Sequence, residues 1–167
     1  MRLFFALWPD EPTRSGLHDL SARMRKACGG RRIGRDNIHA TLAFLGERPE
    51  AELPSLLGAA AGVRASAFDL SLDETGYWKH NRIAWAGASA PPAQLAELAA
   101  SLRQGLSGAG IASDPKPFVL HVTLLRDASP PREALSADPI RWPVAEFALV
   151  QSVGGRYSIL ARWPLRG

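Results

Sequence analysis

Apolar positions in the first part of the chain predict two strands and two helices in alternation. Residues 2–8 form a nearly continuous apolar run ended by Pro9, which is typical of a strand buried on both faces. A helix begins at residues 10–12, where acidic residues and a proline mark its first turn, and it ends at Gly29-Gly30. Residues 38–45 are again strand-like, and residues 50–64 carry alanine and leucine at helical spacing.

The middle of the chain predicts two strands followed by a helix. Residues 68–72 alternate between apolar and polar side chains, as in a half-exposed strand, and we expect this strand to run on to residue 78. Residues 82–86 are expected to pair with it. After Pro91-Pro92, four leucines at positions 95, 98, 102 and 106 lie on one face of an amphipathic helix.

The last third predicts three strands. Residues 118–125 repeat the character of residues 38–45. Residues 146–153 and 156–163 form two further strands, joined by Gly154-Gly155, a dipeptide typical of a tight hairpin turn. This order of elements predicts an α+β fold in which helices cover antiparallel sheets.

A duplication is visible in the element order, because each half contains a helix followed by a strand that bears the same tetrapeptide. No linker separates the halves. We therefore expect residues 1–167 to form a single bilobal domain, in which two lobes related by a pseudo-twofold place their sheets around a central cleft and their helices outside.

Composition narrows the class of protein. The 167 residues are 46% apolar and 22% charged, as expected for a globular chain, and no apolar run is long enough to span a bilayer. The N-terminus lacks signal-peptide features, so we expect a cytoplasmic protein. Cys28 is the only cysteine, which excludes an internal disulfide and a cysteine-based zinc site.

The net charge of +4 favours an anionic partner such as RNA only weakly. Most of the cations are arginines, and a GC-rich genome would give the same bias.

The candidate chemistry lies in the repeated tetrapeptide His-x-Thr-Leu, at residues 39–42 and 121–124. Residues i and i+2 of a strand share one face, so His39 lies beside Thr41, and His121 beside Thr123. One such pair would most simply be a histidine bonded to a neighbouring carbonyl. Two matched pairs in matched contexts indicate a site with two imidazoles and two hydroxyls.

Such a site can perform general acid and general base catalysis on a phosphate. The ordinary histidine pKa near 6.5 lets one ring be neutral while the other is protonated. Threonine hydroxyls can donate to the non-bridging phosphate oxygens. The spacing of the four histidines does not favour a metal site, so we expect neither metal nor cofactor.

The segments HATLAFLG and HVTLLR, with RLFFALWPD and RYSILARWPL near the ends, resemble the two-histidine phosphoesterases. The chain is most similar to the RNA 2',3'-cyclic phosphodiesterases of that superfamily, also named 2'-5' RNA ligases. The resemblance implies a bilobal α+β fold and a metal-independent hydrolysis that leaves a 2'-phosphate. It also implies an RNA partner with a 2',3'-cyclic phosphate end, such as tRNA halves, and we expect a monomer.

The resemblance assigns roles that the symmetric repeat cannot. His39 would donate a proton to the departing 3' oxygen, and His121 would activate water. Thr41 and Thr123 would hold the phosphate. Arg126 follows His121 by five positions and would face away in a regular strand, but a bulge could turn it towards the phosphate.

Further candidates are contacts to RNA. Phe44 is the counterpart of Arg126 in the first motif and offers a stacking surface or a core side chain. Trp78 and His80 lie in a basic, aromatic turn that could contact a nucleotide. Arg35 belongs to an arginine cluster that suits backbone phosphates or is simply solvated.

Two alternatives stay open. The chain could bind RNA ends without turnover, or it could hydrolyse small cyclic nucleotides. Ligation of a cyclic phosphate end to a 5' hydroxyl would use the same groups, because it is the reverse of the cleavage reaction.

Overall fold

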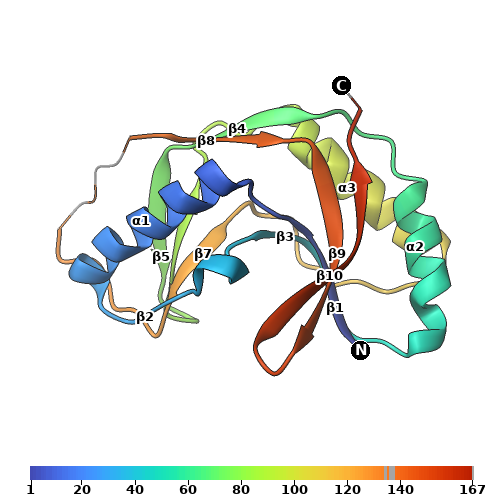
Figure 1. The fold of residues 1–167 in the computed structure, drawn as a ribbon, viewed down its shortest axis with the longest axis horizontal. Helices are drawn as coiled ribbons and strands as arrows, with labels where there is room; N and C mark the ends of the chain where they lie inside the picture. Colours follow the sequence, from blue (N-terminus) through green and yellow to red (C-terminus); the bar gives the residue numbers. More distant parts are fainter. Residues whose placement is uncertain (134, 136–137, 167) are drawn as a thin grey trace.

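The computed structural model describes residues 1–133, 135 and 138–166 and has an α+β architecture (Figure 1). In chain order the elements of the described residues are β1 (Arg2–Leu7), α1 (Glu11–Cys28), β2 (Arg31–Arg32), η1 (Arg35–Asn37), β3 (Ala40–Glu47), η2 (Glu50–Glu52), α2 (Leu53–Ala61), β4 (Phe68–Leu72), β5 (Glu74–Trp78), β6 (Ile83–Gly87), α3 (Ala93–Gly108), β7 (Val122–Arg126), β8 (Ile140–Val144), β9 (Glu146–Val153) and β10 (Arg156–Pro164). The predicted fold class is confirmed.

Most strands belong to one antiparallel sheet in the order β10-β9-β1-β3-β7-β6-β5, with β2 paired to β7. A separate two-stranded sheet joins β4 to β8. Within the large sheet, β3 and β7 meet at a single residue pair, Ala40 with Val122. This narrow seam divides the sheet into two halves, and each half contributes one of the two His-x-Thr-Leu segments.

The helices cover different parts of this sheet. Figure 1 shows α1 on the side of β2, β5 and β7, whereas α2 and α3 lie together at the other end of the molecule. Helix α1 begins where the Asp10 carboxylate accepts a hydrogen bond of 2.9 Å from the Thr13 amide. It ends at Gly29, whose φ of 63° lies in the left-handed region that favours glycine.

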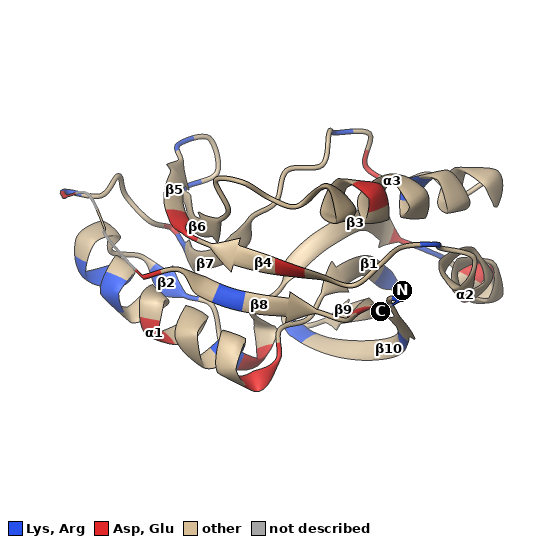
Figure 2. Ribbon diagram, turned by 90° about the horizontal axis from the view of Figure 1, so that it is seen from above, with Lys and Arg blue, Asp and Glu red and all other residues tan. Residues whose placement is uncertain are grey.

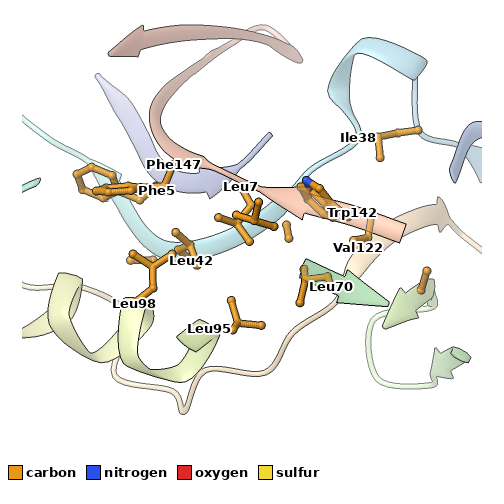
Figure 3. Packing of buried hydrophobic residues seen from close by; sticks show 14 of the residues in the cluster. Phe5, Leu7, Ile38, Leu42, Leu70, Leu95, Leu98, Val122, Trp142 and Phe147 are labelled. Carbon is orange, nitrogen blue, oxygen red and sulfur yellow. The ribbon is translucent and has the colours of Figure 1, made fainter. Parts of the chain in front are cut away.

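One large hydrophobic cluster lies between the helices and the strands and includes residues of both halves. Figure 3 shows Phe5, Leu7 and Leu42 from the central strands near Leu95 and Leu98 of α3. The leucines predicted on one face of α3 are all buried. The two halves therefore share a core.

Both motif strands begin later than predicted, at Ala40 instead of residue 38 and at Val122 instead of residue 118. The two histidines consequently lie immediately before their strands.

The prediction of one continuous strand from residue 68 to residue 78 is wrong, because this segment forms two strands, β4 and β5. The chain changes sheets at Asp73, so that β4 pairs with β8 and β5 pairs with β6. The Asp73 carboxylate holds this crossing by accepting hydrogen bonds from the amide and the hydroxyl of Ser89, at 2.7 and 2.6 Å.

Strand β8, which contains Pro143, was not predicted. Proline is tolerated there because the sheet has only two strands, which leaves an unpaired edge. The helix expected over residues 50–64 is shorter, with a 3-10 turn before α2. Within the described residues, no helix has the length and apolar character required to span a membrane.

Candidate active site

The two His-x-Thr pairs lie at the seam between β3 and β7 and line one cavity of about 520 Å³. Thr41 and Thr123 lie near the starts of β3 and β7, and each histidine immediately precedes its strand. Alternation along each strand buries the intervening residue on the core side, as Ala40 and Val122 show, and leaves histidine and threonine on the cavity side.

Each imidazole is oriented in the same way by the backbone. His39 Nδ1 lies 2.6 Å from the Asn37 carbonyl oxygen, and His121 Nδ1 lies 3.1 Å from the Val119 carbonyl oxygen. A carbonyl only accepts, so each Nδ1 carries the hydrogen. In the neutral rings both Nε2 atoms are therefore unprotonated, and they are the atoms available for proton transfer. His39 Nε2 is 3.1 Å from the Thr41 hydroxyl.

A bulge follows each motif at the equivalent position. The ladder of β1 with β3 shifts register between Thr41 and Ala43, and that of β6 with β7 shifts between Thr123 and Leu125. The extra residue in each strand reverses the alternation. Phe44 and Arg126 therefore both line the cavity, although each follows its histidine by an odd number of positions.

Three aromatic rings surround His39. Trp8 stacks parallel to it with ring centroids 5.3 Å apart and an angle of 6° between the ring planes. Phe4 lies at 5.0 Å, and Tyr157 presents its ring at 88° and 5.3 Å. Burial lowers the pKa of His39 to about 4, and the positive charge of Arg126 adds to this shift. The surroundings within the protein therefore favour the neutral form of His39 at neutral pH.

His121 has a different environment. Trp78 meets its ring edge-on, with centroids 4.6 Å apart and an angle of 61° between planes. On its other side Trp78 lies 5.4 Å from Trp85 of β6. The two histidines thus share backbone geometry but not aromatic surroundings.

A group of three or more His, Cys, Asp or Glu side chains able to hold a metal is not found among residues 1–133, 135 and 138–166. The polar groups that line the cavity include the two imidazoles, the two threonine hydroxyls and the Arg126 guanidinium. Such a set can hold a phosphate and transfer protons on either side of it.

Comparisons with known proteins agree with this geometry. The sequence model of the 2'-5' RNA ligase superfamily matches residues 9–156. The chain belongs to this superfamily. It is 39% identical to the RNA 2',3'-cyclic phosphodiesterase of Escherichia coli over 173 residues, which cover 98% of this chain and 96% of that protein. The protein of the same name from Thermus thermophilus is 36% identical, with 100% of this chain and 91% of that protein covered.

Solved structures of superfamily members have the same fold. The crystal structure of E. coli LigT complexed with 3'-AMP matches with a TM-score of 0.82 and 37% identity, and covers 98% of this chain and 97% of that chain. The crystal structure of TT0787 of T. thermophilus matches with a TM-score of 0.82 and 34% identity, over 100% and 99% of the two chains. The resemblance based on the motifs is confirmed.

The other residues predicted to contact RNA lie in different places in this superfamily member. Trp78 and His80 line a second cavity of about 430 Å³, which borders the first at Phe44 and His121. Arg35 instead pairs with Glu11 and donates a hydrogen bond of 2.7 Å to the Ser15 hydroxyl, and it lines neither cavity.

Sequence reasoning missed the residues that enclose His39. Phe4 and Trp8 belong to an apolar run that predicts a buried strand, and Tyr157 lies in the last hairpin, far from both motifs in the sequence. The carbonyls that orient the two rings belong to Asn37 and Val119, which lie outside the repeated tetrapeptides and differ in type, so the repeat carries no signal for them.

Proposed function

We propose that this chain hydrolyses RNA 2',3'-cyclic phosphate ends to 2'-phosphate ends. The observation that carries the proposal is the convergence of two Nε2 atoms, two threonine hydroxyls and Arg126 on one cavity. It is supported by curated relatives named RNA 2',3'-cyclic phosphodiesterase at 39% and 36% identity over nearly the whole chain.

In the proposed reaction the cyclic phosphate lies between the two histidines. His121 Nε2 accepts a proton from water, whose oxygen attacks phosphorus in line with the bond to the 3' oxygen. That bond breaks, and His39 Nε2 gives its proton to the departing oxygen, which leaves the phosphate on the 2' oxygen. Thr41, Thr123 and Arg126 stabilise the charge that develops on the non-bridging oxygens.

Because the pKa of His39 is low, we expect the bound substrate to promote the protonation of this ring. Burial keeps the ring neutral in the protein alone, with a pKa of about 4. A bound phosphodiester brings a negative charge next to Nε2 and offsets the repulsion from Arg126. His39 would therefore take up a proton as the substrate binds, and the acid would form only in the complex.

The proposal extends to the RNA itself. Phe44 is 39% exposed, and with Trp78 and His80 it offers aromatic surface for nucleotides next to the phosphate. One chain supplies all the groups that line the cavity, so we take the active form to be a monomer acting on cytoplasmic RNA such as tRNA halves. Ligation would be the same attack on the cyclic phosphate, with a 5' hydroxyl in place of water.

The test is incubation of the purified protein, in EDTA, with a short RNA that ends in a 2',3'-cyclic phosphate, with 2'- and 3'-phosphate products resolved. His39→Ala and His121→Ala are each expected to reduce kcat by several orders of magnitude. His18→Ala is the matched control, since this helical histidine does not line the cavity.

Other outcomes separate the alternatives. Turnover that survives in both cavity variants would refute the two-histidine mechanism. If the wild type binds the RNA without turnover, the chain is a module that recognises RNA ends. If only small cyclic nucleotides are cleaved, the reaction stands but RNA is not the substrate.

A further inference from the structure

Exposed cations gather where α1 ends beside β2. Arg23, Arg25 and Lys26 are exposed on the last turns of α1, Arg31 is exposed on β2, and Arg132 is exposed in the loop after β7. We call these five residues the α1–β2 basic surface. Figure 2 shows blue segments along this end of α1 and on β2, with red segments towards the start of the helix.

The backbone holds these residues together. The Arg132 amide donates to the Ala27 carbonyl at 3.3 Å, and the Ser129 amide donates to the Cys28 carbonyl at 2.8 Å, so the loop after β7 lies against the helix end. Two shallow hollows share Lys26. One of about 350 Å³ also contacts Arg23 and Arg132, and one of about 330 Å³ also contacts Arg25 and Arg32.

The α1–β2 basic surface continues into the proposed active site. Arg31 is the direct cross-strand partner of Arg126, the cation that lines the catalytic cavity. Side chains of such partners lie about 5 Å apart at their Cβ atoms. Cationic side chains therefore follow one another from the cavity across β2 to the end of α1, with the Asp127 carboxylate paired to Arg31 between them.

Local structure accounts for only part of this charge. The positive charges of Arg25 and Lys26 in the last turn of α1 interact favourably with the helix macrodipole. Arg31 forms an ion pair of 2.8 Å with Asp127. Glu133 is the acidic side chain at the hollow that contacts Arg132, and among the described residues no acid lines the hollow that contacts Arg25. Among the described residues, each hollow is lined by more cations than carboxylates, as an anionic partner requires.

We propose that the α1–β2 basic surface binds backbone phosphates of the RNA strand on the 5' side of the reacting end. The inference rests on the proposed function, because the strand is taken to begin at a cyclic phosphate beside Arg126. Phosphate contacts of this kind carry no sequence preference, but they depend strongly on salt. The surface would make longer RNA a better substrate than a mononucleotide.

The test compares Arg25→Gln/Lys26→Gln/Arg132→Gln with the matched variant Arg64→Gln/Arg141→Gln/Arg166→Gln, which removes three exposed cations from elsewhere. Each is assayed on a 2',3'-cyclic mononucleotide and on an RNA of about 20 nucleotides with a 2',3'-cyclic end, over a range of salt. For the basic-surface variant we expect kcat/KM on the long RNA to fall about tenfold at low salt. Its log–log salt dependence should become less steep by roughly 2.

Mononucleotide turnover should be unchanged in both variants. Three results would each overturn the α1–β2 basic surface as a strand-binding site. They are an equal loss of kcat/KM in the matched variant, a loss of kcat/KM on the mononucleotide as well, and an unchanged kcat/KM of the basic-surface variant on the long RNA.

A second readout separates this inference from the proposed function. Affinity for a long RNA ending in a 3'-phosphate is measured by fluorescence anisotropy, which needs no turnover. If the wild type binds this RNA but cleaves no substrate, the proposed function fails. If, in addition, the basic-surface variant binds more weakly than the wild type and the matched variant does not, the strand-binding surface is still supported. Equal affinities of both variants and the wild type would refute the surface.

Discussion

His39 and His121 have the same motif and the same backbone contact, yet their surroundings distinguish them. His39 lies among Phe4, Trp8 and Tyr157, whereas His121 meets Trp78 edge-on. An enclosed imidazole resists protonation because its charged form loses hydration. The two histidines therefore differ through rings that belong to neither motif.

His39 should make the protein less stable in acid. Its folded pKa of about 4 lies below the unfolded value near 6.5, so the unfolded chain binds the additional proton between these values. Stability present above pH 6.5 is lost as the pH falls towards 4, by up to about 3 kcal/mol. Urea unfolding at neutral and acid pH should show a smaller loss for His39→Gln than for the wild type. His18→Gln should keep the wild-type loss, and the expectation is wrong if both variants behave alike.

Arg126 should control the proton affinity of His39 as well as the phosphate. Its charge lowers the pKa of His39, so Arg126→Ala is expected to raise that pKa. NMR titration of the histidine rings in the absence of substrate measures this directly. The same variant should lower kcat/KM about a hundredfold by removing a charged phosphate contact. An unchanged His39 titration would show that the guanidinium lies too far from the ring to matter.

At the scale of elements, periodicity predicted most strands and helices, but it could not predict where backbone geometry departs from regularity. In a regular strand the side chain of Arg126 would point away from the cavity. The bulge after Thr123 reverses the alternation, so that Arg126 lines the cavity. The strand change at Asp73 depends on Ser89, which is distant in sequence. Local pattern determines an element's type, whereas long-range contacts determine its partners and breaks.

Gly76 in β5 leaves room for the Trp85 ring of β6, which packs against Trp78, the ring that contacts His121. Gly76 is opposite Trp85, and a Cβ at position 76 would lie 2.1 Å from the Trp85 ring. Gly76→Ala is therefore expected to displace Trp85, and with it Trp78, at a cost of about 1–3 kcal/mol. Urea unfolding measures the stability and a cyclic phosphate assay measures the activity, and both should fall.

Gly58→Ala is the matched control for this prediction. No described atom lies within 4 Å of a Cβ at position 58, and alanine favours the helix there. This control should be as stable as the wild type or more so. Full activity in Gly76→Ala would mean that the ring can shift without disturbing His121.

At the scale of the whole molecule, the two halves of the sheet meet at one residue pair, yet their side chains share one core. The seam pair, Ala40 with Val122, contributes little ladder hydrogen bonding. In contrast, the large hydrophobic cluster contains Phe5 and Leu149 from one half and Ala84 and Leu125 from the other. The seam can therefore be open enough for a phosphate while the core beneath it stays closed.

This shared core predicts that residues 1–167 unfold as one cooperative unit. Trp8 and Trp163 report on the half that contains β1 and β10, and Trp78 and Trp85 report on the half that contains β5 and β6. Urea transitions followed by far-UV circular dichroism, and by fluorescence of variants that keep only one of these tryptophan pairs, should share one midpoint for each variant. Separate midpoints would make the halves independent domains. Inorganic phosphate should raise the common midpoint, because the proposed site would bind it through Thr41 and Thr123 from opposite halves, and Thr123→Val should reduce that increase.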